Sequence, residues 1–436
     1  MAPARLVALG LAVSLSPLTA ADARWPGFQN GGDLSLEADA SPWLGELMTA
    51  WTTKIEGHGQ ASPVVWDGRV YATSTIGENK ETFRIVCLDA ETGERLWKWD
   101  VENPSPKPNN VYTSRAAPTP AADEDGVIVF FEGGILAALT HAGELRWQRN
   151  LIEEFGADDT RFGQSGSVEQ TEKNGFVWMA RQEGDYVLAF DKASGETVWK
   201  VDGPGVTSWS SPRLVPTAAG DHLVLSGTGS VVGLDPETGK QLWRADGLSG
   251  NTTPTPVPVG EGQFLIGASR GRGEIPEEDA AASNALFEIK PAGEGFEVSK
   301  VWGAERATSS FGTPMAHGGL AWILNGTGVL YGLDAETGEK RVTKRLSSSM
   351  WATPVGVGDV VVFPTKDGAL DFVSADDSAE IRKSYQVLPE PDAPAEEEGG
   401  RRRGNFGGPV LYGIAIVGDR MFVRDGDAVY CVTPAG

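Results

Sequence analysis

The fold class that this sequence predicts is all-β: an eight-bladed β-propeller made of four-stranded antiparallel blades. One turn motif recurs along the chain, and a small residue followed by Pro opens an apolar run upstream of the copies. The length of 436 residues is long for one compact core and favours an architecture that grows by repetition. The 56 glycines also favour short strands joined by tight turns.

The turn motif has Asp four residues before Gly and eight before a large apolar residue, as in Asp89 to Trp97. An Asp side chain can accept backbone N–H bonds, and Gly can take the positive φ that closes a hairpin. The Trp begins the next strand, where we expect its ring to be buried between blades while its N–H meets a carbonyl. The predicted turn and blade-docking residues are Asp89, Gly93, Trp97, Trp147, Asp191, Gly195, Trp199, Asp235, Gly239, Trp243, Asp334 and Gly338.

The number of units predicts the topology. Pro-opened triples of strands begin near residues 62, 117, 211, 253, 313, 353 and 408, and a unit without Pro begins near 164. Fourth strands begin near residues 51, 97, 147, 199, 243, 302, 342 and 381. The chain starts with an orphan fourth strand at Trp51 and ends after a third strand, so the N-terminal strand should complete the last blade and close the ring.

The N-terminus resembles an export signal. Arg5 precedes an apolar run from Leu6 to Leu18, and Ala21-Asp22-Ala23 fits a cleavage site. We therefore predict a signal peptide over 1–23, a propeller over 24–436 with an acidic, Pro-rich loop insertion at 389–404, and a periplasmic or extracellular location. No Cys follows the apolar run, so we expect no lipid anchor of the lipobox type, and no other run is long enough for a membrane span.

Composition argues against several function classes. A formal net charge of −23 repels nucleic acid, and the Arg401–Arg403 cluster is expected to lie in a solvated loop beside acidic residues. Cys87 and Cys431 are too few for a disulfide framework and are expected to be buried packing residues. The four histidines show no ligand spacing, and no catalytic motif is present. The sequence therefore predicts neither a metal site nor a catalytic residue.

The repeated turn, preceded by an apolar strand ending in Leu-Asp, resembles the repeat of the pyrroloquinoline-quinone-like (PQQ-like) propellers. These include quinoprotein alcohol dehydrogenases and BamB-type outer-membrane assembly proteins, and the resemblance covers about residues 25–436. Such dehydrogenases typically place two adjacent cysteines over the quinone, but no Cys-Cys dipeptide occurs here, and the calcium ligands cannot be placed. Our main hypothesis is therefore a monomeric, non-enzymatic binding or scaffold protein without a cofactor. The alternative is a dehydrogenase dependent on PQQ and calcium, with a degenerate site.

Aromatic residues recur just before the units that open the blades, where loops lead into the innermost strands. A ring of aromatics at the channel mouth could stack on a flat ligand, a sugar or a peptide of an envelope or extracellular protein. The alternative is that they pack blade against blade. The candidate ligand-binding residues are Phe162, Trp209, Phe311, Trp351 and Phe406.

Overall fold

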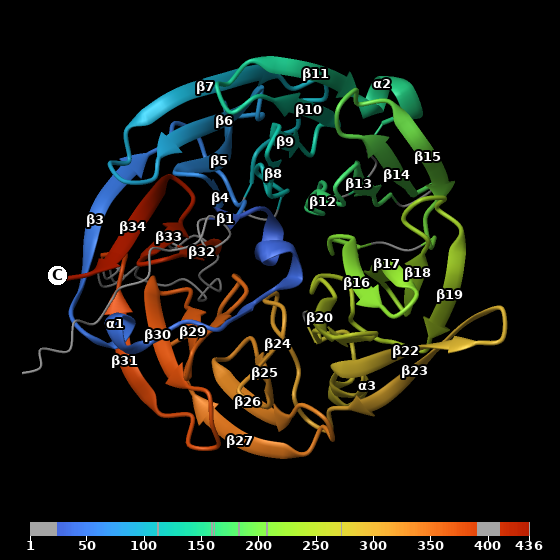
Figure 1. Cartoon of the computed structure of the whole chain (residues 1–436), viewed down its shortest axis with the longest axis vertical. Coiled ribbons are helices and arrows are strands. Elements are labelled where there is room, and N and C mark those ends of the chain that lie inside the picture. Colours follow the sequence, from blue (N-terminus) through green and yellow to red (C-terminus); the bar gives the residue numbers. More distant parts are fainter. Residues whose placement is uncertain are drawn as a thin grey trace, which may run out of the picture.

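The computed structural model describes residues 24–110, 113–157, 160, 162–181, 184–205, 208–271, 273–389 and 410–435. Eight sheets, each built on four antiparallel strands, follow one another around a ring (Figure 1). The predicted eight-bladed propeller is therefore confirmed. The predicted signal peptide and nearly all of the predicted loop insertion lie outside the described residues.

Each of the first four blades runs from a short inner strand to an outer strand. Their strands are β4 (Val64–Trp66), β5 (Arg69–Ile76), β6 (Thr82–Asp89) and β7 (Arg95–Glu102); β8 (Ala121–Asp123), β9 (Gly126–Phe130), β10 (Ile135–Leu139) and β11 (Leu145–Asn150); β12 (Glu169–Gln170), β13 (Asn174–Met179), β14 (Tyr186–Asp191) and β15 (Thr197–Asp202); β16 (Arg213–Thr217), β17 (Gly220–Gly227), β18 (Ser230–Leu234) and β19 (Gln241–Asp246).

The remaining blades follow the same order. Their strands are β20 (Val257–Gly260), β21 (Gln263–Ile266), β22 (Ala285–Ala292) and β23 (Gly295–Gly303); β24 (Met315–His317), β25 (Leu320–Leu324), β26 (Val329–Asp334) and β27 (Lys340–Arg345); β28 (Val355–Val357), β29 (Val360–Pro364), β30 (Ala369–Ser374) and β31 (Ile381–Gln386); β32 (Gly413–Val417), β33 (Arg420–Arg424), β34 (Ala428–Pro434) and β3 (Leu47–Lys54). Within the described ranges, three short α-helices lie in connections: α1 (Ser41–Leu44), α2 (Leu151–Phe155) and α3 (Glu277–Ala282).

The ring closes as the sequence predicts. β3 pairs antiparallel with β34, with Trp51 opposite Cys431, so the last blade contains strands from both ends of the chain. The first strand of this blade begins at Gly413, a few residues after the predicted opening near 408, as the first strands of the other blades also follow their predicted openings. The closure leaves neither β3 nor β34 as a lone terminal strand.

The segment before β3 adds a feature that the repeat did not predict. β1 (Arg24–Trp25) extends the first blade on β4, and β2 (Ser35–Leu36) pairs in parallel with β28 of the seventh blade. Between them the short 3-10 helix η2 (Phe28–Gly32) lies inside the ring, against β16 of the fourth blade (Figure 1). The first described residues therefore connect blades on different sides of the ring.

The recurring Trp and Gly meet across the gap between consecutive blades. The Trp97 indole N–H donates to the His141 carbonyl oxygen at 2.9 Å, and that of Trp199 donates to the Pro236 oxygen at 2.9 Å. Each acceptor lies in the turn of the next blade. Trp51, Trp147 and Trp302 donate in the same way to Ala90, Lys192 and Ala335.

The turn Gly lies flat against the same indole. A Cβ on Gly195 would stand 2.6 Å from the Trp147 ring, and one on Gly93 would stand 2.6 Å from the Trp51 ring. Both glycines also have φ above 70°, so side chains are excluded by space and by backbone conformation.

The Asp of the motif shapes the turn from within. The Asp89 carboxylate accepts the backbone N–H groups of Glu91 and Thr92 at 2.9 and 2.8 Å. These bonds to the charged form hold the pKa of Asp89 below its usual value. The pKa values of Asp191 and Asp334 are lowered by equivalent bonds.

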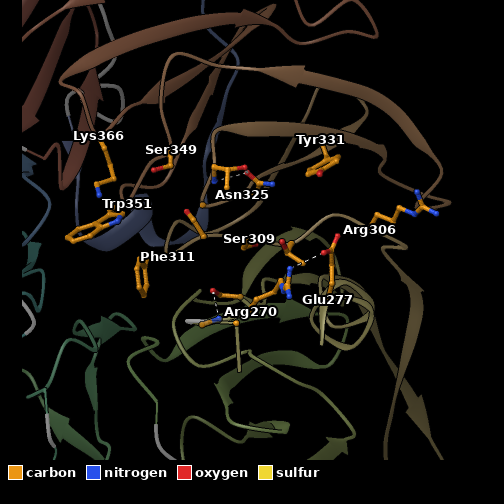
Figure 2. A pocket seen from close by; sticks show the side chains of 17 residues that line it. Arg270, Glu277, Arg306, Ser309, Phe311, Asn325, Tyr331, Ser349, Trp351 and Lys366 are labelled. Carbon is orange, nitrogen blue, oxygen red and sulfur yellow. Dashed lines mark hydrogen bonds and ion pairs between the residues drawn. The ribbon is translucent and has the colours of Figure 1, made fainter. Parts of the chain in front are cut away.

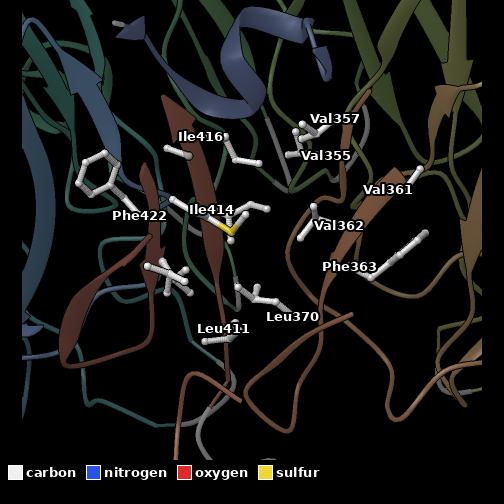
Figure 3. Packing of buried hydrophobic residues seen from close by; sticks show 14 of the residues in the cluster. Val355, Val357, Val361, Val362, Phe363, Leu370, Leu411, Ile414, Ile416 and Phe422 are labelled. Atoms are coloured by element: carbon white, nitrogen blue, oxygen red, sulfur yellow. The ribbon is translucent and has the colours of Figure 1, made fainter. Parts of the chain in front are cut away.

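Apolar side chains fill the spaces between neighbouring blades. Figure 3 shows valines of β28 and β29 facing Ile414 and Ile416 of β32, with Phe422 of β33 beyond them. Ile414 is 4% exposed and Phe422 is 0% exposed. Burial of these β-branched and aromatic residues supplies the main favourable free energy of blade packing.

Candidate ligand-binding site

The loops that enter the inner strands share one end of the ring with the turns between second and third strands, because successive strands are antiparallel. Loops of the fifth, sixth and seventh blades line an open cavity of about 580 Å³ at this end. Its walls come from the loop before α3, the segment between β23 and β24, and the turns at Asn325 and Lys366. This volume is in the range of small-molecule sites, roughly 300–1,000 Å³.

Two of the five candidate aromatic residues line this cavity. Phe311 and Trp351 meet edge to face, with ring centroids 5.6 Å apart. Phe311 is 49% exposed, whereas Trp351 is half-buried. Figure 2 shows both rings at one end of the cavity beside Lys366.

The other candidate aromatics lie elsewhere. Phe162 and Trp209 contact each other between the third and fourth blades, with ring centroids 5.8 Å apart, and do not line this cavity. Phe406 is outside the described residues. The described aromatics thus form blade-to-blade contacts and keep part of their surface exposed, so the two sequence interpretations are compatible at these positions.

Lys366 is held against the aromatic end of the cavity. Its ammonium lies 4.6 Å from the centre of the Trp351 ring, within the range of a cation–π contact. Burial lowers the pKa of this ammonium. Trp351 therefore packs against both Phe311 and Lys366 and orients them relative to each other.

The opposite end of the cavity is also basic. Arg306 lies there (Figure 2), and Arg270 pairs with Glu277 at 2.9 Å. Glu277 is the single carboxylate among the described lining residues. The cavity wall therefore carries an excess of positive charge in a chain whose formal charge is −23.

Sequence reasoning missed these basic residues because they do not repeat. Lys366 and Arg306 lie in loops of different blades, about 60 positions apart in the chain, and neither belongs to a recurring motif. The one feature of the sequence that could have indicated them is their position relative to the recurring units in which a small residue and Pro open the first strand of a blade. Arg306 shortly precedes Phe311, and Lys366 lies in the turn after β29, the second strand of the unit that Thr353-Pro354 opens.

A second cluster of ionisable residues lies at the same end of the ring, between the eighth and first blades. His58 contacts Asp427 at 3.0 Å, and burial together with the charges of Arg115 and Arg424 lowers its pKa to about 4. Arg424 is fully buried and donates from Nη2 to the carbonyl oxygens of Thr73 and Gly426. The His58 ring also contacts the Tyr412 ring edge to face, and the Tyr412 and Trp351 ring centroids are 6.1 Å apart.

The cavity beside Phe311 has few of the carboxylate ligands that calcium prefers. Calcium takes six to eight oxygen ligands, several of them carboxylates. Within the described ranges no group of three or more His, Cys, Asp or Glu residues is arranged to hold a metal, and the cavity lining is mainly basic and hydroxylated.

Comparison with known proteins assigns the chain to a family. A family model described as "Outer membrane protein assembly factor BamB" matches residues 48–171, 182–274 and 292–395. The chain belongs to this family. The BamB family assignment agrees with the repeat described above and with the eight-bladed ring.

Curated relatives come from two functional classes. BamB of Yersinia pestis is 22% identical over 223 residues, which are 51% of this chain and 52% of that protein. The 1-butanol dehydrogenase (cytochrome c) of Thauera butanivorans is 26% identical over 166 residues, which are 37% of this chain and 23% of that protein. The chain thus matches about half the length of the BamB relative and less of the dehydrogenase.

Solved structures show the same fold. BamB from Moraxella catarrhalis has a TM-score of 0.59 at 13% identity, over 89% of this chain and 98% of that one. Quinohemoprotein alcohol dehydrogenase from Comamonas testosteroni has a TM-score of 0.62 at 16% identity, over 95% of this chain and 81% of that one. At such identities the likeness shows the fold alone. In the described part of the chain, no helix is long and apolar enough to cross a membrane.

Proposed function

We propose that this chain is an exported, non-enzymatic binding propeller of the cell envelope, and that it holds its partner or ligand at the cavity beside Phe311. The cavity itself is the observation that carries the proposal, because loops of three blades converge on an exposed aromatic residue and several cations. The family supports this class of function, since its description and one curated relative name an assembly factor.

A capture experiment tests the proposal. Immobilised protein is incubated with an envelope fraction, and captured material is compared between the wild type and the variant Phe311→Ala/Trp351→Ala. Phe296→Ala serves as a matched control, because Phe296 is a partly exposed aromatic at the β22–β23 turn, at the opposite end of the ring. Capture lost in the double variant and kept in the control supports the proposal. Equal capture by all three proteins contradicts it.

The second candidate is a dehydrogenase dependent on PQQ and calcium, which the butanol dehydrogenase relative favours. Purified protein mixed with PQQ and calcium would then keep quinone absorbance after desalting and would reduce a dye with alcohols or aldose sugars. No retained absorbance and no dye reduction would exclude this candidate.

A further inference from the structure

The charges that line the cavity favour a ligand with negative charge. Arg306 and Lys366 stand at opposite ends, and the carboxylate of Glu277 is already paired with Arg270. The net charge of the chain, −23, repels anions at long range. A long polyanion would meet that repulsion, whereas a short ligand with one or a few acidic groups would contact the cavity alone.

The aromatic end selects a ligand with a ring. Phe311 presents a flat apolar surface that is 49% exposed, and the edge contact with Trp351 fixes its orientation. A ring that packs on Phe311 would place its substituents near the ammonium of Lys366, which Trp351 holds. A ligand ring with an acidic substituent could therefore contact the exposed Phe311 ring and the Lys366 ammonium together.

The remaining wall is suited to a ligand with many hydroxyl groups. Ser and Thr side chains line it, including Thr308 and Ser349, together with the amide of Asn325. Gly271 and Gly273 leave backbone open to the cavity, since no described heavy atom lies within 4 Å of a Cβ built on either residue. Short hydroxyls and open backbone can donate and accept hydrogen bonds in several directions.

We infer that this cavity binds an acidic saccharide, in which a sugar ring packs on Phe311 and its carboxylate or sulfate pairs with Lys366. Arg306 would meet an acidic group further along the same oligomer. The inference rests on the proposed function and names the ligand class of that site. Trp351 acts here as a positioning residue, because its contacts are to Phe311 and Lys366.

A peptide fits the wall less well. Extended peptides gain affinity by adding a strand to an exposed sheet edge. The cavity is lined by loops and turns, apart from Glu277 at the start of α3 and Tyr331 in β26, a strand that is paired on both sides by β25 and β27. The described lining therefore offers no open strand edge for backbone pairing.

Titration calorimetry with three probes tests the inference: trigalacturonate, the neutral sugar maltotriose, and hexaglutamate as an acidic peptide. The wild type is expected to bind trigalacturonate at least tenfold more tightly than either other probe, with affinity that falls as salt rises. Phe311→Ala and Lys366→Gln should each weaken trigalacturonate binding at least tenfold. Phe311→Tyr and Lys366→Arg should retain most of it, because the ring and the charge remain.

Two matched variants control for general effects. Phe296→Ala removes an aromatic ring at the opposite end of the propeller, and Lys54→Gln removes an exposed charge from the outer strand β3. Both should bind trigalacturonate like the wild type. Circular dichroism confirms that each variant is folded before titration.

Several outcomes overturn the inference: equal affinity for the acidic and neutral sugars, tighter binding of hexaglutamate, no binding of any probe at millimolar concentration, or wild-type affinity in both Phe311→Ala and Lys366→Gln. If trigalacturonate fails to bind but Phe311-dependent capture of an envelope component persists, the ligand class is wrong and the binding function stands. If capture also fails, the proposed function is wrong as well.

Discussion

The guanidinium of Arg213 lies 2.8 Å from the Glu169 carboxylate, and its Nη2 donates to the Phe28 carbonyl oxygen at 2.9 Å. The side chains of Arg213 and Glu169 are only 2% and 9% exposed. They belong to the inner strands of the fourth and third blades. This buried pair therefore connects two blades with the N-terminal segment inside the ring.

Arg213→Ala is expected to lower the free energy of unfolding by roughly 3–5 kcal/mol, because the buried Glu169 carboxylate loses its counter-charge. Urea denaturation followed by tryptophan fluorescence measures the change. Arg244→Ala is the control, since Arg244 pairs with Asp246 at 2.7 Å on the exposed outer strand β19. That change should cost less than about 1 kcal/mol. Similar losses in both variants would contradict the role of burial.

Gly195→Ala should destabilise the protein by about 3 kcal/mol or more. Gly195 has φ 76°, and a Cβ there would stand 2.6 Å from the Trp147 ring, so strain adds to a clash at the blade contact. Gly247 has φ 86° but no described heavy atom within 4 Å of a Cβ. Gly247→Ala should therefore cost only about 1–2 kcal/mol from the backbone alone. Equal urea midpoints for the two variants would rule out the contact with Trp147 as the cause.

The sequence predicted the ring because the residues that join blades are local and repeated. Asp89, Gly93 and Trp97 lie within nine positions. The same contact with the next blade recurs at Trp51, Trp97, Trp147, Trp199 and Trp302. Trp243 shows the limit of this pattern. The next blade has a degenerate turn, and the Trp243 indole N–H instead donates to His222 Nδ1 of its own blade at 2.9 Å.

The candidate site could be predicted only in part. Phe311 and Trp351 were found because they keep a fixed spacing from the repeated small-Pro units. Lys366 and Arg306 come from loops that vary between blades, and their approach depends on the three-dimensional ring. The N-terminal segment was missed for a related reason, since β1 and β2 are two residues long and carry no periodic pattern.

Cys87 and Cys431 should be unreactive in the folded protein. Both are free and fully buried, and burial raises the pKa of the Cys87 thiol to about 12 and that of Cys431 to about 11. Because the thiolate is the reactive form, iodoacetamide at pH 8 should label neither residue in buffer and both in denaturant. Mass spectrometry gives the number of labels. A label acquired within minutes in buffer would contradict the packing described for β6 or β34.

His58 should make the protein less stable as the pH falls from about 6.5 towards 4. Its folded pKa of about 4 is below the ordinary value of 6.5, so the unfolded chain binds a proton in this window while the folded protein does not. The contribution of His58 to the free energy of unfolding is therefore fully present above pH 6.5. It decreases as the pH falls below this value, by about 2 kcal/mol at pH 5.

Urea denaturation of the wild type and His58→Gln at pH 7 and pH 5 separates this contribution from the other groups. Burial also lowers the pKa values of His222 and His317, and both residues remain in the variant. The wild type should therefore lose about 2 kcal/mol more than His58→Gln between the two pH values. An equal loss in both proteins would mean that His58 becomes protonated as easily in the folded ring as in the unfolded chain, against the influence of Arg115 and Arg424.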